Sequence, residues 1–122
     1  MPTNKKYVTW EEVEACVDAI CETYRDSNFK GIYGLPRGGL CIATMVSYRL
    51  NIPLLMAPIK GCLIFDDISD TGETLLHYKS GAYDKYEVAT MYYRKGSLVK
   101  PDFYFAEKAD DWIVFPWEEK QN

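Results

Sequence analysis

The sequence predicts an α/β fold in which helices flank a mostly parallel central sheet. Short apolar segments typical of strands alternate along the chain with segments whose apolar residues recur at helical spacing. Residues 63–65 (Leu-Ile-Phe) are all apolar, as expected for a strand buried on both faces of a parallel sheet. The chain has 122 residues and we find no repeat or linker in it, so we expect a single domain over residues 1–122.

The first predicted helix begins at Thr9, because Thr9 and Glu12 have the spacing of a capping box. Its apolar residues recur at helical spacing: Val13, Val17, Ile20, Cys21 and Tyr24. We then expect strands at residues 31–35, 53–57, 62–65, 87–93 and 103–106, and helices at 40–50 and from 74 to about 79. Residues 112–117 contain a central Pro116 and are expected to be irregular or a short edge strand.

Composition limits the classes of function. Hydrophobic residues make up 48% and charged residues 26%, which is typical of a globular protein. The net charge of −4 argues against a general nucleic-acid binder, which is normally basic. The chain has no apolar run long enough to cross a membrane and no signal peptide at Met1–Tyr7, so we expect no membrane partner and a cytoplasmic location.

The cysteines are expected to be small buried hydrophobic residues, because Cys16, Cys21, Cys41 and Cys62 form no CxxC pair and have apolar neighbours. His77 is the only histidine, so a zinc site is not expected. Nothing local supports a cysteine–histidine nucleophile pair.

The most informative motif is the segment 63–75, LIFDDISDTGETL. Asp66 and Asp67 follow the buried strand, where paired carboxylates can accept hydrogen bonds from sugar hydroxyls or hold the water shell of a metal. The loop from Ser69 to Thr74 offers hydroxyls, backbone N–H groups and the flexible Gly72 at the start of a helix, which suits a phosphate. Together they indicate a ribose 5-phosphate pocket. The alternative is a solvated strand end followed by an ordinary turn and helix cap.

A second strand-to-helix loop, residues 34–39 (GLPRGG), is expected at the same edge of the sheet. Glycines let the backbone approach an anion, and Arg37 offers a planar fork of donors to phosphate oxygens. Two such loops could hold two phosphate groups separately. A plain turn is the alternative for this loop.

The segment 63–75 closely resembles the phosphoribosyl-pyrophosphate (PRPP) signature of the type I phosphoribosyltransferases. The resemblance implies that Asp66 and Asp67 bind the ribose hydroxyls, and that a Mg²⁺ cofactor is held by this pair through water or substrate. It implies a 5-phosphate site at Asp70, Thr71, Gly72, Glu73 and Thr74, and a pyrophosphate site at Arg37, Gly38 and Gly39. Asp66, Asp67 and Asp70 are the predicted catalytic residues; a carboxylate repels phosphate, so Asp70 is expected to turn towards the base as acid or base.

The segment 112–118 (WIVFPWE) resembles the base-binding hood of the xanthine-guanine and archaeal purine phosphoribosyltransferases. Residues 8–13 and 99–104 also resemble that subgroup, so the similarity spans nearly the whole chain. It implies a hood over about residues 95–122, with Trp112 stacking on a purine and the backbone of Ile113 reading its exocyclic edge. Arg94 stands where those enzymes place a lysine for the 6-oxo group, with Lys95 beside it. A hydrophobic C-terminal strand docked on the core is the alternative for 112–118, and a surface basic pair for Arg94 and Lys95.

One departure concerns the long mobile loop that these enzymes close over PRPP. Here only residues 57–61 separate Met56 from Cys62, so no lid of that kind can form. The region 75–86 also looks compressed.

The sequence thus predicts a compact enzyme, a PRPP-dependent pentosyltransferase of purine salvage. Its expected partners are PRPP and a 6-oxopurine (guanine, hypoxanthine or xanthine), and a homodimer or higher homo-oligomer is expected. The alternatives are a non-catalytic module that binds PRPP or a nucleotide, and a phosphoribosyltransferase for another base.

Overall fold

The computed structural model describes residues 4–80 and 86–118, and its centre is a parallel sheet of four strands in the order β2-β3-β4-β5. The strands are β2 (Ile32–Gly34), β3 (Leu63–Ser69), β4 (Glu87–Arg94) and β5 (Phe103–Lys108). β3 and β4 lie in the middle of the sheet and are mostly apolar, as expected for strands covered on both faces. The predicted α/β fold class is confirmed.

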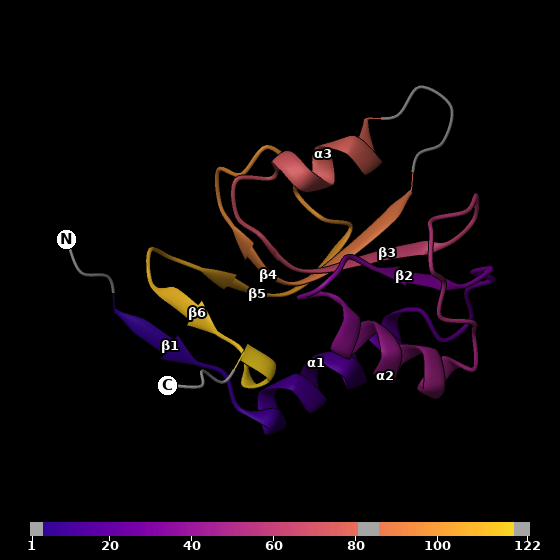
Figure 1. Ribbon diagram of the computed structural model, residues 1–122, viewed down its shortest axis with the longest axis horizontal. Helices are drawn as coiled ribbons and strands as arrows, with labels where there is room; N and C mark the ends of the chain where they lie inside the picture. Colours follow the sequence, from indigo (N-terminus) through magenta and orange to yellow (C-terminus); the bar gives the residue numbers. More distant parts are fainter. Residues whose placement is uncertain (1–3, 81–85, 119–122) are drawn as a thin grey trace.

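Helices cover both faces of this sheet. Figure 1 shows α1 (Trp10–Thr23) and α2 (Leu40–Leu50) on one face and α3 (Glu73–Lys79) on the other. The larger part of the core lies beneath α1 and α2, where Val17, Ile42 and Phe65 are completely buried. A smaller cluster beneath α3 contains Ile64 and Leu75.

The start of α1 follows from local chemistry. The Thr9 hydroxyl accepts a hydrogen bond from the Glu12 N–H at 3.1 Å, and the Thr9 N–H donates to the Glu12 carboxylate at 2.9 Å. These two bonds satisfy N–H groups that a helix N-terminus leaves unpaired. The predicted capping box is therefore confirmed.

A second, two-stranded sheet lies at one end of the molecule (Figure 1), where β1 (Lys5–Tyr7) pairs in parallel with β6 (Trp112–Val114). The short 3₁₀ helix η1 (Pro116–Glu118) follows β6. Of the two alternatives expected for residues 112–117, irregular chain or a short edge strand, the structure shows a short strand, whereas β1 was not predicted. Of the range 95–122 predicted as a hood, β5 belongs to the central sheet, and residues 119–122 lie outside the described part of the chain.

The strand predicted at residues 53–57 is wrong. Leu54 forms only an isolated bridge with Ile32, through hydrogen bonds from the Ile32 N–H to the Pro53 carbonyl and from the Leu55 N–H to the Ile32 carbonyl. Pro53 and Pro58 have no N–H to donate to a longer ladder.

The predicted boundaries of the signature strand also need correction. β3 does not end at Phe65 but continues through both aspartates to Ser69, because Asp66, Ile68 and Ser69 pair with β4. The predicted compressed region 75–86 contains α3, and its residues 81–85 lie outside the described part of the chain.

Every helix within residues 4–80 and 86–118 is too short or too polar to span a lipid bilayer.

Candidate active site

The loop between β3 and α3 has a backbone that its neighbours hold in place. Gly72 has φ +88°, a conformation that side chains disfavour, and a Cβ there would lie 2.6 Å from the Leu98 nitrogen. The Leu98 N–H donates to the Thr71 carbonyl at 2.8 Å. The segment after β4 therefore packs directly against the turn and leaves room only for glycine.

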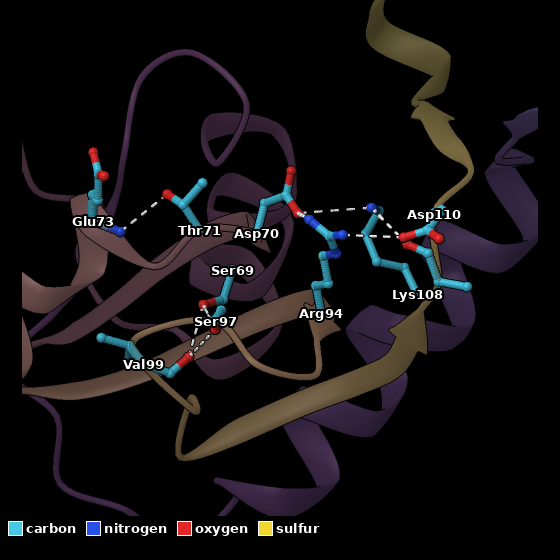
Figure 2. Close-up of polar contacts among 10 residues, drawn as sticks. Ser69, Asp70, Thr71, Glu73, Arg94, Ser97, Val99, Lys108 and Asp110 are labelled. Atoms are coloured by element: carbon cyan, nitrogen blue, oxygen red, sulfur yellow. Dashed lines mark hydrogen bonds and ion pairs between the residues drawn. The ribbon is translucent and has the colours of Figure 1, made fainter. Parts of the chain in front are cut away.

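Serine hydroxyls also connect the β3–α3 loop to the segment after β4. The Ser69 hydroxyl donates to the Val99 carbonyl at 2.8 Å and lies 3.1 Å from the Ser97 hydroxyl, as Figure 2 shows. On the other side of the turn, the Thr71 hydroxyl accepts the Glu73 N–H at 3.2 Å. The side chains of Glu73 and Thr74 are exposed.

A small pocket of about 100 Å³ lies within this loop. Its lining residues come from β3, the turn and the first part of α3: Asp66, Ile68, Ser69, Asp70, Thr71, Gly72, Thr74 and Leu75. The structure therefore brings most of the predicted 5-phosphate residues together, with Asp66 at the edge of the pocket.

Asp66 and Asp67 form a half-buried pair of carboxylates. The Asp66 carboxylate accepts the Asp67 N–H at 2.8 Å, and the Asp67 carboxylate accepts the Ile68 N–H at 2.8 Å. Burial and the neighbouring Asp67 charge raise the pKa of Asp66 to about 8, and burial also raises the pKa of Asp67. Near neutral pH the pair therefore retains a proton, so it can both donate to and accept from the hydroxyls of a sugar.

The two carboxylates line different cavities. Asp66 lines the small pocket, whereas Asp67 lines a larger open cleft of about 1550 Å³. Neighbouring residues of a strand point to opposite faces, so this division follows from the continuation of β3 through both residues. The carboxylate pair thus lies at the junction of the two spaces.

The larger cleft brings residues distant in sequence together. Its walls include Arg37 and Gly38 from the loop after β2, and Trp112 from β6. Gly38 lies so close to Asp67 that a Cβ would stand 2.1 Å from the Asp67 carboxylate. Arg37 is exposed, and Trp112 exposes 64% of its surface, so both are available to a ligand.

Two other predicted site residues are buried in the structure. A Cβ at Gly39 would lie 2.6 Å from the Phe65 carbonyl, so this glycine permits close packing of the loop against β3. Ile113 is buried in β6, which leaves only its backbone for the predicted contact with a base.

Charged groups from adjacent strands meet beside the loop between β3 and α3. Asp70 lies 3.6 Å from the Arg94 guanidinium and 3.8 Å from the Lys108 ammonium, and Arg94 also donates to Asp110 at 3.0 Å (Figure 2). Arg94 and Lys108 end β4 and β5 and are register partners. Asp70 and Arg94 were predicted from the sequence, whereas Lys108 was missed because β5 was expected to end at Ala106.

Two carboxylates, Asp66 and Asp67, are the side chains in this site that could hold the expected Mg²⁺. Within residues 4–80 and 86–118 we find no group of three or more metal-binding side chains. Mg²⁺ commonly uses one or two carboxylates together with water and substrate phosphates, and Asp66 and Asp67 could supply that part.

No protein-family model matches the sequence. The chain is 28% identical over 134 residues to a xanthine-guanine phosphoribosyltransferase of Chromohalobacter salexigens, covering 91% of this chain and 82% of that one. A second enzyme of that name, from Idiomarina loihiensis, is 27% identical over 139 residues, covering 92% and 86%.

Among solved structures, the fold matches a purine phosphoribosyltransferase of Pyrococcus horikoshii with a TM-score of 0.80 and 29% identity, over 98% of this chain and 97% of that one. The chain has the fold of the type I phosphoribosyltransferases. The predicted resemblance is thereby confirmed, and so is the predicted class of enzyme, a phosphoribosyltransferase.

Proposed function

We propose that this phosphoribosyltransferase transfers ribose 5-phosphate from PRPP to a ring nitrogen of a 6-oxopurine and releases pyrophosphate. The supporting observation is the position of Asp66 and Asp67 between two spaces of different size. PRPP has its 5-phosphate and its pyrophosphate on opposite sides of the ribose, and the two spaces suit these groups separately.

In the proposed complex the 5-phosphate occupies the small pocket and accepts hydrogen bonds from backbone N–H groups and hydroxyls of residues 70–74. The ribose hydroxyls lie on Asp66 and Asp67. Arg37 and the backbone at Gly38 and Gly39 hold the pyrophosphate. Bound Mg²⁺ would neutralise part of the charge on the leaving group.

The anomeric carbon becomes electron-poor as pyrophosphate departs, so catalysis consists mainly of positioning and charge stabilisation. The base is expected to stack on Trp112, with Asp70 near N7 and the Ile113 backbone at the exocyclic edge. The exposed ring of Trp112 in the cleft with Asp67 and Arg37 supports this arrangement.

The connection before β3, residues 57–61, is too short to form a long loop that closes over this site. Closure protects a reactive intermediate from water, so an open site is expected to hydrolyse some PRPP. A neighbouring subunit could supply the cover, which agrees with the expected homo-oligomer. We propose a cytoplasmic enzyme without nucleic-acid or membrane partners.

The test measures pyrophosphate release and nucleotide formation together, with Mg²⁺, PRPP and guanine, hypoxanthine, xanthine or adenine in turn. Equal formation of both products with a 6-oxopurine supports the proposal, and pyrophosphate without nucleotide indicates hydrolysis by an open site. The Asp67→Asn variant should lose activity, whereas Asp26→Asn, an exposed aspartate distant in sequence, should retain it.

The alternative of a non-catalytic nucleotide-binding module predicts a different result. In that case the protein binds PRPP or a nucleotide tightly but forms neither product with any base. The absence of a long loop is compatible with this alternative, whereas the enzyme names of the relatives disfavour it. Turnover with a pyrimidine or nicotinate but with no purine would instead favour a phosphoribosyltransferase for another base.

A further inference from the structure

We propose that Thr90 is a positioning residue for the ribose site: its buried hydroxyl holds the Asp66 carboxylate in the orientation that accepts the ribose hydroxyls. Thr90 is completely buried and acts only through Asp66, which lines the small pocket. This inference rests on the proposed function for one point, the contact between Asp66 and the ribose. It deepens that function by adding the group that supports this contact.

The first argument is a buried donor that lacks an acceptor. Thr90 has no exposed surface, and among residues 4–80 and 86–118 its Oγ1 atom has no hydrogen-bond partner. An unpaired hydroxyl in the interior costs free energy, so most buried side-chain polar atoms of proteins are hydrogen-bonded. An unpaired buried donor next to a binding residue therefore needs an explanation, and the residue beside it supplies one.

The second argument is position in the sheet. Thr90 of β4 and Asp66 of β3 are register partners, and neighbouring strands of a sheet lie about 4.8 Å apart. Side chains alternate between faces along a strand. Val88 and Ile64, two residues before Thr90 and Asp66, belong to the core cluster beneath α3, so both partners project from that same face. Rotation about the Cα–Cβ bond of Thr90 can then direct its hydroxyl to the Asp66 carboxylate.

The third argument is that Asp66 is the better acceptor of the two neighbours of Thr90 across the sheet. The other neighbour is Tyr104 of β5, whose hydroxyl already donates to the Glu107 carboxylate at 3.4 Å. The Asp66 carboxylate accepts the Asp67 N–H at 2.8 Å, and a carboxylate has about four acceptor positions. Asp66 can therefore accept from Thr90 and from a ligand together.

A ribose in the small pocket gives this hydrogen bond its use. The ribose hydroxyls donate to oxygens of Asp66, and they are held in one place only if the carboxylate does not turn. The Asp67 N–H holds the carboxylate from within β3, and the Thr90 hydroxyl holds it from β4. Two anchors on neighbouring strands fix the plane of the carboxylate, as a precisely built binding site requires.

The test separates a hydrogen bond that serves the ligand from one that serves the fold. Calorimetric titration of the full chain compares ribose 5-phosphate with inorganic phosphate, which has no sugar hydroxyls. The wild-type protein should bind ribose 5-phosphate more tightly. Thr90→Val replaces the hydroxyl by a methyl group of similar size. It should weaken ribose 5-phosphate binding about 10- to 100-fold, as expected for a lost hydrogen bond to a charged group, and change phosphate binding less than about twofold.

Stability should not follow affinity in these variants. In urea unfolding without ligand, Thr90→Val should have a midpoint equal to or above that of the wild type, because an apolar group replaces an unpaired buried hydroxyl. Thr90→Ser keeps the hydroxyl but loses a buried methyl group, so its midpoint should fall while it retains most of its affinity for ribose 5-phosphate. As a control, Thr23→Val makes the same exchange at an exposed position of α1 and should leave both affinities unchanged.

Three results would overturn the proposal: a wild-type protein that binds ribose 5-phosphate no more tightly than phosphate, a Thr90→Val variant that keeps the wild-type ratio of the two affinities, or a loss of both affinities together with a lower urea midpoint in that variant. The proposed function fails separately, because nucleotide formation from PRPP tests it. A protein that forms no nucleotide, yet loses its preference for ribose 5-phosphate in Thr90→Val, would refute transfer and keep the role of Thr90.

Discussion

Replacing Gly72 by alanine should destabilise the protein, and the proposed phosphate loop at residues 70–74, far more than replacing Gly96 by alanine. Both glycines have positive φ, +88° and +95°, so a Cβ at either position costs about 1–2 kcal/mol of conformational free energy. At Gly72 the Cβ would also lie 2.6 Å from the Leu98 nitrogen and 2.7 Å from the Val99 nitrogen. At Gly96 it would meet nothing within 4 Å.

The magnitude follows from these contacts. The two nitrogens belong to the backbone and cannot rotate away, so the loop or the segment 98–99 must move. Overpacking of this kind costs about 1–3 kcal/mol. Gly72→Ala should therefore lower the free energy of unfolding by about 2–5 kcal/mol in total. Gly96→Ala should lower it by about 1–2 kcal/mol.

Urea unfolding measures the two stabilities, and calorimetric titration with ribose 5-phosphate measures the loop. We expect Gly72→Ala to lose most of its affinity for ribose 5-phosphate and Gly96→Ala to retain it. Equal destabilisation of the two variants would refute the packing argument. Unchanged binding in Gly72→Ala would refute the assignment of the phosphate site.

Three further predictions concern the carboxylate pair, the base cleft and the first helix. Because the pKa of Asp66 is raised to about 8, the folded protein holds a proton that the unfolded chain releases near pH 4, and the free energy of unfolding should fall as pH rises from about 4 to 8. Asp66→Asn should flatten this dependence in ligand-free urea unfolding at pH 5 and pH 8.5, and an identical slope in both proteins would contradict the burial argument. Trp112→Ala should change stability by less than about 0.5 kcal/mol, because the side chain is mostly exposed, but should weaken purine binding by about 1–3 kcal/mol in calorimetry; unaltered affinity would remove the stacking role. Thr9→Ala should lower the free energy of unfolding by about 1 kcal/mol through loss of the helix cap, whereas Thr23→Ala, at the other end of α1, should not; equal effects would argue against the cap.

Much of the fold could be predicted because local patterns decide it. The apolar run before Asp66 and the Thr9–Glu12 spacing each have one favourable structure, and both appear as predicted. The strand predicted at residues 53–57 was wrong. Their apolar side chains suit a strand, but the number of backbone hydrogen bonds they can form depends on how far β2 extends beside them.

The site was predicted less completely, because its geometry depends on partners distant in sequence. The sequence shows that Asp66 and Asp67 are adjacent, but only the pairing of Asp66 with Thr90 places them within a strand and on opposite faces. Lys108 resembles an ordinary surface lysine in the sequence. Lys108 lies two residues after Ala106, so in a strand extended past the predicted end both side chains would point to the same face. That two-residue spacing was the available signal.

The pairing of β1 with β6 has a consequence for the order of events during synthesis. A ribosome releases β1 before any other strand, whereas its partner β6 emerges after the whole central sheet. Joining such distant segments costs loop-closure entropy that earlier contacts reduce, so the central sheet can form first. The nascent protein would then complete the small pocket proposed for the 5-phosphate before Trp112, the proposed stacking partner of the base, was in place.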